Sequence, residues 1–173
     1  MSAKADVANA TPKQQFLTTL DREHRTTMRV LRAYPADQLD MRPHPTCRTA
    51  RELAWVFVVE RGLGTAVYQN QLQELMSGEM PEPPESWDAL LEALEDAQRL
   101  FRDLIDATPE EELHDKVSFF VGPKQMGEMT RFEWLWFLLH DEIHHRGQFS
   151  IYLRMAGGKV PSIYGPTADE PWM

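Results

Sequence analysis

Three histidines lie within six residues near the end of the chain, at His140, His144 and His145. If this segment is helical, residues four positions apart share a face, so His140 pairs with His144 and Asp141 pairs with His145. Two donors one turn apart, joined by a third ligand from a neighbouring helix, commonly bind metals in helical proteins. The segment therefore predicts a metal site with two alternative ligand pairs.

The apolar periodicity of this segment favours Asp141 and His145 as the inward pair. Both residues continue its apolar stripe, whereas His140 and His144 point about a quarter-turn away. A carboxylate on an apolar stripe is costly to bury unless a partner compensates its charge. The other members of the stripe are Trp134, Leu138, Gln148 and Tyr152.

A second acid, Glu60, lies in the middle of another apolar face and needs a metal, a cation or a hydrogen-bond donor. If Glu60 meets Asp141 and His145, two carboxylates and one imidazole form a set that favours Zn²⁺, Mn²⁺, Fe²⁺ or Ni²⁺. The competing interpretation is an ion pair between Glu60 and Arg61, Arg146 or another surface cation. The apolar residues around Glu60 are Leu53, Val56, Phe57, Leu63 and Val67.

The neighbours of this set supply further chemistry. His144 or His140 is the candidate general acid and base beside the metal. Arg146 and Gln148 carry a guanidinium and an amide that can orient a carboxylate substrate, although Arg146 can equally pair with Glu142 on the helix surface.

Composition excludes several classes of function. The chain has 173 residues, 42% hydrophobic content and a formal net charge of −9, which disfavours nucleic acid and anionic lipid as partners. No apolar run reaches the roughly 20 residues that span a bilayer. The single Cys47 excludes an internal disulfide framework and indicates a reducing cytoplasm.

Helical periodicity with Pro- and Gly-bearing links predicts an all-α four-helix bundle. Between the last two helices, 116–122 is expected to be extended against the bundle. Gly147 lowers helix stability, so we expect it to permit a close approach of another helix or the tail. The four predicted helices are 12–33, 49–76, 86–107 and 130–156.

Both ends of the chain carry predictions. Residues 1–11 are expected to be a flexible arm, and 12–173 a single domain with a packed C-terminal tail. In that tail Ile163, Tyr164 and Trp172 should be anchored, with Tyr164 near the end of the last helix. Large apolar groups on more than one face of that helix, at Trp134, Trp136 and Phe137, predict a homodimer interface.

The segment HHRGQFSIYLR, followed by VPSIYGPTADE, resembles the DinB/YfiT-like superfamily of metal-dependent enzymes. The resemblance covers residues 12–173, including RPHPTCRTARELAWVF before the second helix. It implies a four-helix bundle, often a homodimer, with a metal held by one His of the second helix and two His of the last. It also implies kinship with S-transferases that use low-molecular-weight thiols and with a maleylpyruvate isomerase.

This chain departs from the implied three-histidine pattern. His145 matches the His before Arg-Gly-Gln, but the partner four residues earlier is Asp141 and the second-helix position is Val56. Valine cannot bind a metal, and Glu60, one turn on, is the substitute we infer. Two hypotheses result: a metal-dependent hydrolase or thiol S-transferase using Glu60, Asp141 and His145, or a metal-free bundle dimer that binds a small ligand or is structural.

Overall fold

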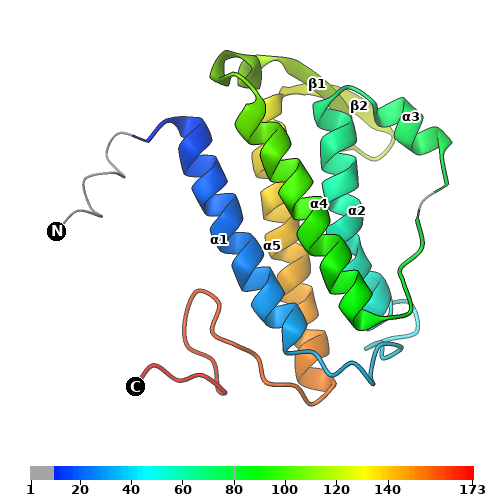
Figure 1. Cartoon of the computed structure of the whole chain (residues 1–173). Coiled ribbons are helices and arrows are strands. Elements are labelled where there is room, and N and C mark those ends of the chain that lie inside the picture. The colour runs from blue at the N-terminus through cyan, green and yellow to red at the C-terminus, as the bar shows by residue number, and fades with distance from the viewer. Residues whose placement is uncertain (1–9, 80) are drawn as a thin grey trace.

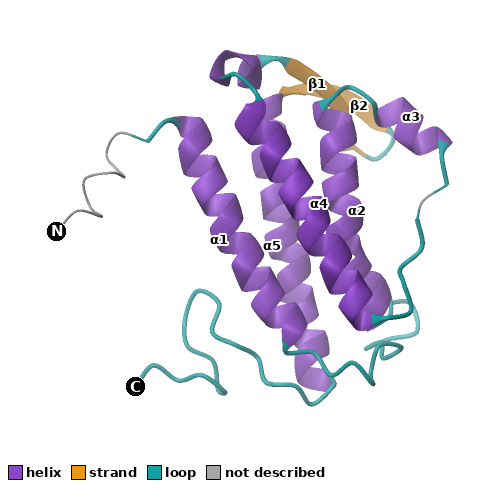
Figure 2. Ribbon diagram, in the orientation of Figure 1, coloured by secondary structure: helices purple, strands orange, loops and turns teal. Residues whose placement is uncertain are grey.

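The computed structural model describes residues 10–79 and 81–173, and over this part the chain is mostly helical. Long helices lie side by side, as Figure 1 shows, with α1 and α2 each packed against both α4 and α5. Figure 2 shows a small sheet at one end of these helices. The long helices are α1 (Pro12–Arg32), α2 (Ala50–Tyr68), α4 (Trp87–Ala107) and α5 (Arg131–Met155).

The helices begin where the sequence provides capping residues. Thr11, Thr49 and Thr130 each accept a backbone amide three residues on, and the side chain at that third position returns to the cap amide. Such capping boxes satisfy amides that the first turn leaves without partners. The predicted helices 12–33, 86–107 and 130–156 are therefore confirmed to within a residue or two.

The second predicted helix, 49–76, is too long. In the structure α2 ends at Tyr68, and a separate short helix, α3 (Leu72–Ser77), follows. Asn70 between them has a φ of 58°, a left-handed conformation that ends an α-helix and that Asn tolerates better than most residues.

The link before α5 contains the 3₁₀ helix η2 (Glu110–His114) and a hairpin of β1 (Lys116–Gly122) and β2 (Gln125–Thr130). The extended segment predicted at 116–122 is confirmed, but its partner strand was missed. Apart from Thr130, that strand lacks the β-branched and aromatic residues that signal a strand. The described part of the chain is thus mostly helical, as predicted, with a small two-stranded sheet added at one end.

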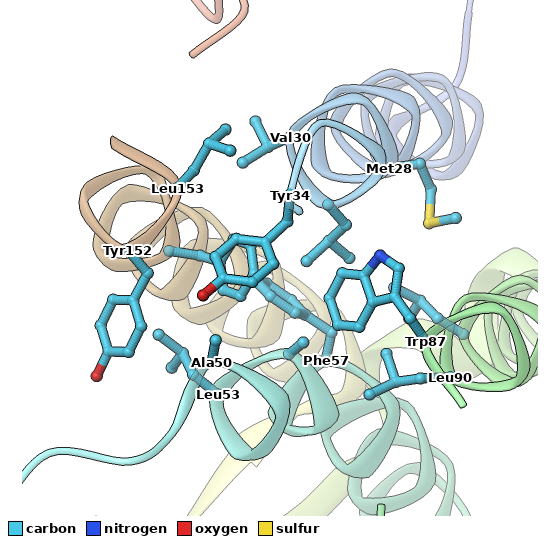
Figure 3. Packing of buried hydrophobic residues seen from close by; sticks show 14 of the residues in the cluster. Met28, Val30, Tyr34, Ala50, Leu53, Phe57, Trp87, Leu90, Tyr152 and Leu153 are labelled. Carbon is cyan, nitrogen blue, oxygen red and sulfur yellow. The ribbon is translucent and has the colours of Figure 1, made fainter. Parts of the chain in front are cut away.

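Buried apolar residues form two clusters at opposite ends of the long helices. One lies where α1 and α5 end and where α2 and α4 begin, and Figure 3 shows Phe57 and Trp87 among its members. The other lies at the hairpin end and contains Phe101 and Trp134. Between the clusters runs a polar midlayer, which includes the buried residues Glu23, Thr27, Glu60, Arg61, Gln98, Glu142 and Arg146.

The C-terminal tail was predicted to pack back on the helices, and only part of it does so. Val160 is buried and Ile163 packs against the apolar cluster. The Tyr164 hydroxyl reaches Arg146, in the middle of α5 and not at its end. Trp172 is 64% exposed, so the expectation that it is anchored is wrong.

The arm predicted for 1–11 falls, up to residue 9, outside the described residues, while Thr11 caps α1. No helix in the described part of the chain combines the length and apolar content that crossing a bilayer requires.

Two glycines differ in what surrounds them. A Cβ at Gly64, on α2, would lie 2.7 Å from Leu138 Cδ1 of α5 and 3.1 Å from Phe101 Cε2 of α4. The Gly64 carbonyl also accepts the Trp134 indole N–H at 3.2 Å. At Gly64 α2 therefore packs closely against both α4 and α5, with no room for a side chain. Nothing lies within 4 Å of a Cβ at Gly147, so the close approach predicted there is wrong.

Replacing Gly64 with Ala should lower the free energy of unfolding by about 1–3 kcal/mol, because the added methyl group overpacks the helix contact. The control is Gly62→Ala on the same helix, where a Cβ meets nothing within 4 Å. That change should stabilise the protein by about 0.5–1 kcal/mol through helix propensity. Urea denaturation measures both, and equal effects of the two substitutions would contradict the packing argument.

Candidate metal centre

The structure brings Glu60 of α2 together with Asp141 and His145 of α5. Each offers a ligand atom, and these atoms all lie within 4.8 Å of one another. His145 Nδ1 lies 2.7 Å from Glu60 Oε1 and 3.8 Å from Asp141 Oδ1. We call this group the acidic triad. It joins a one-turn pair on one helix to a single ligand on the next, the arrangement that bundle metal sites use.

One oxygen of the acidic triad has no protein partner. Glu60 is 4% exposed, and its Oε2 is buried without a hydrogen bond to any described residue. A buried carboxylate oxygen without a partner costs free energy, so a cation there would satisfy it. The three oxygen and nitrogen donors also suit a divalent metal of intermediate hardness. The residues therefore fit a metal ion.

The protonation of Glu60 and His145 is coupled through their hydrogen bond. Burial raises the pKa of Glu60 above its ordinary value, although the hydrogen bond with His145 opposes this shift. The same hydrogen bond with Glu60 raises the pKa of His145, and burial opposes it. The pair holds its proton more tightly than either free group, so a metal bound here would have to displace that proton.

The remaining predicted residues lie outside the acidic triad. His140 is exposed, with its ring 6.0 Å from that of Trp136. His144 is also exposed, its ring 5.3 Å from that of His145, and its Nε2 lies 2.8 Å from Gln148 Nε2. Of the two candidate acid–base groups, His144 is thus the one beside a triad ligand.

Arg146 is buried on the side of α5 that meets α1. Its guanidinium donates to Glu23 Oε2 at 2.8 Å, to Thr27 Oγ1 at 3.3 Å and to the Tyr164 hydroxyl at 2.7 Å. The alternative pairing with Glu142 on the helix surface is wrong, because Glu142 is fully buried. The structure does not bring Arg146 together with the acidic triad.

Glu142 belongs to a second buried network that the sequence reasoning missed. It pairs with Arg61 and accepts the Thr27 hydroxyl at 2.7 Å, while Arg61 Nε donates to Gln98 Oε1 at 2.5 Å. Arg61 and Arg146 therefore have acids other than Glu60, contrary to the competing interpretation of that residue. One sequence signal could have found the buried position of Glu142. Glu142 and Arg146 lie on the same helix face as apolar residues, because the positions are spaced by three or four along the helix: Leu135, Leu139, Glu142, Arg146 and Phe149.

Comparison with known proteins places this chain in a family. The family model described as the DinB family matches residues 1–172. The chain belongs to the DinB family. Val56, where the family resemblance implies a histidine, is half-buried one turn before Glu60 on α2.

Two solved structures share the fold, and one curated relative matches a short segment of the chain. A DinB-like protein from Bacillus cereus matches with a TM-score of 0.70 and 21% identity, over 86% of this chain and 95% of its own. The DinB-like protein YjoA from Bacillus subtilis matches with a TM-score of 0.70 and 15% identity, over 87% and 97%. The uncharacterized protein YrdA of Bacillus subtilis is 36% identical over 58 residues, which are 34% of this chain and only 32% of YrdA.

The buried ion pair of Glu23 and Arg146 should control stability. Glu23→Gln leaves the buried guanidinium without its counter-charge, and we expect the free energy of unfolding to fall by about 3–5 kcal/mol. Tyr164→Phe removes one hydroxyl that lies 2.7 Å from both groups, and should cost about 1 kcal/mol. Urea denaturation compares them, and an equal or larger loss in Tyr164→Phe would contradict this ranking.

The same pair should make stability depend on acid pH. Burial acts to raise the pKa of Glu23, but hydrogen bonds from Tyr164 and Arg146 outweigh it and hold that pKa below 4.5. A lowered pKa in the folded state contributes stability above pH 4.5, and this contribution is lost as the pH falls through the folded value. The difference in unfolding free energy between wild type and Glu23→Gln should therefore shrink from pH 6 to pH 3. A constant difference would contradict the assignment.

Proposed function

We propose that this DinB-family protein is a four-helix-bundle enzyme that binds a divalent metal through Glu60, Asp141 and His145, and that it acts as a hydrolase or thiol S-transferase. The observation that carries the proposal is the buried, partnerless Oε2 of Glu60 within the acidic triad. Leaving this oxygen buried without a partner costs free energy, which a bound cation would recover. A bound Zn²⁺, Ni²⁺, Mn²⁺ or Fe²⁺ ion would supply Lewis acidity that lowers the pKa of a water or of a low-molecular-weight thiol.

The residues around the acidic triad have separable tasks in this proposal. Glu60 and Asp141 supply negative charge, which holds the cation, and His145 supplies a neutral nitrogen once its proton has left. His144, exposed beside His145, accepts or returns a proton of the reacting group, and Gln148 keeps the His144 ring in place across their 2.8 Å contact. His140, whose ring contacts that of Trp136, is the secondary candidate for the proton transfer.

A metal-free function is the second candidate, and one distance favours it. The 2.7 Å hydrogen bond between His145 Nδ1 and Glu60 Oε1 already gives two of the potential metal-binding atoms a partner without any ion. In that case the protein is a dimer that binds a small ligand or is structural. Metal titration separates the two candidates.

Adding Zn²⁺, Ni²⁺ or Mn²⁺ to chelator-treated protein should raise the melting temperature, because the ion binds only the native state. At about 100 times the Kd the expected rise is about 5–10 °C. Asp141→Ala and His145→Ala should lose most of this response, and His140→Ala should keep it. Differential scanning fluorimetry and elemental analysis of untagged protein provide the measurements. If no metal shifts the wild type, or if His140→Ala alone loses the response, the acidic triad is not the metal site.

We also propose that the protein is a cytoplasmic homodimer with small-molecule partners. The cytoplasmic location rests on the single cysteine. The dimer rests on an exposed apolar surface that joins the hairpin to α5. There Phe137 is 46% exposed and contacts the buried Trp134, while Phe120, Val121 and Met126 of the hairpin are also exposed.

Phe137→Glu should therefore shift the protein from dimer to monomer in light scattering at micromolar concentration, since a charge in an apolar interface opposes association. Leu100→Glu is the control, because Leu100 is 61% exposed on α4, away from this surface. A wild-type particle of 20.0 kDa would contradict the dimer.

A further inference from the structure

An open groove of about 720 Å³ lies beside the cap of α2 and the last turns of α5. Its lining is mixed, with charged, polar and apolar side chains. These include Thr46, Cys47 and Arg48 from the link before α2, Leu53 of α2, and Gln148 and Tyr152 of α5. Figure 3 shows the Tyr152 ring at the edge of the apolar cluster, with its hydroxyl directed away from the cluster.

The groove lies along the same two helices as the acidic triad. Leu53 precedes Glu60 by seven residues on α2, and Tyr152 follows His145 by seven residues on α5. At 1.5 Å of rise per residue, seven residues correspond to about 10 Å. Gln148 lies between, because it lines the groove and also contacts His144, the neighbour of His145. The groove therefore lies about two helical turns from the acidic triad, with Gln148 between them.

Arg48 is an unpaired cation in this groove. The chain has thirteen arginines, all of them among the described residues, and ten form ion pairs with acids. Arg48 is exposed and forms none. Glu52 is near enough for Arg48 to help lower its pKa, after the larger effect of the Thr49 amide that its Oε2 accepts at 2.6 Å. A free guanidinium in a protein of net charge −9 marks a local site for an anion.

The backbone that carries Arg48 is held in place. The Tyr152 hydroxyl donates to the Arg48 carbonyl at 3.0 Å, which ties the link to α5. The Cys47 amide donates to the His44 carbonyl at 2.9 Å, and Thr49 directly after Arg48 caps α2. The guanidinium therefore extends from a fixed point at the rim, and less conformational entropy is lost when a ligand binds.

We propose that this groove binds the carboxylate of a small organic acid, with Arg48 as its charge partner and with Thr46 and Gln148 as hydrogen-bond donors. One guanidinium with neutral donors matches one carboxylate group, whereas a phosphate dianion would bring both of its charges to a single cation. Leu53 and Ile151 offer apolar contact to the carbon chain of the acid. The inference rests on the proposed function only for the reaction, in that the far end of the acid would reach the acidic triad.

Cys47 provides the readout, because it is the chain's single cysteine and lines the groove. The rate at which the neutral reagent 4,4′-dithiodipyridine modifies Cys47 is measured against succinate concentration, in chelator-treated protein and again with added Zn²⁺. Succinate should slow the modification of wild type. Arg48→Gln should weaken this protection by about 10-fold or more, since a hydrogen-bonded charge pair is lost.

The matched control is Arg25→Gln, which removes the same charge from an exposed arginine of α1 that also forms no ion pair and lies outside this groove. It should be protected as well as wild type, and Arg48→Lys should retain part of the protection. Equal protection in Arg48→Gln and Arg25→Gln, or none in wild type, overturns the inference. Stronger protection by inorganic phosphate than by succinate overturns the choice of a carboxylate.

Two further outcomes separate this inference from the proposed function. Protection that requires Zn²⁺ and survives Arg48→Gln would mean that succinate binds the metal alone, so the groove inference fails and the metal proposal stands. Protection that depends on Arg48 in a protein that shows no metal response would leave the groove inference standing and remove the metal-dependent reaction.

Discussion

The ion pair between Arg61 and Glu142 crosses the middle of the helices in a place that water does not reach. Breaking such a pair leaves a buried charge, so α2 and α5 can pack only in the register that keeps these two residues opposite each other. The pair of Glu23 and Arg146 imposes the same condition on α1 and α5. The apolar clusters on either side supply most of the burial, and the polar midlayer decides how the helices align.

The acidic triad depends on that alignment. Glu60 directly precedes Arg61, and His145 lies three residues after Glu142, so the register that joins one pair also joins the other. The three residues of the acidic triad thus stand on long helices that buried ion pairs and hydrogen bonds hold together, an arrangement that keeps the geometry of a site precise. His144 and Gln148 are also on α5, but their side chains are exposed to solvent.

Local signals in the sequence predicted most of the fold and part of the site. Apolar periodicity and Pro- and Gly-bearing links located the long helices. The acids and the histidine on apolar faces, at Glu60, Asp141 and His145, indicated a common site that the structure brings together. Strand β2 and the break at Asn70 escaped, because their conformations depend on contacts and single-residue dihedrals that periodicity does not encode. Arg61 and Glu142 escaped for another reason: charged residues are usually exposed, and only the three-dimensional partner explains their burial.

The C-terminal tail is joined to α1 by a hydrogen bond, because the Tyr164 hydroxyl donates to the Glu23 carboxylate across 141 sequence positions. During synthesis α1 emerges from the ribosome long before α5 and the tail exist. Until then the carboxylate of Glu23 can form a hydrogen bond with neither Arg146 nor Tyr164, so its burial is unfavourable and it stays exposed to water. The polar midlayer therefore cannot form one helix at a time during synthesis, and we expect folding to be completed only after the tail has been made. Chains that terminate early should remain partly unfolded and be susceptible to proteolysis.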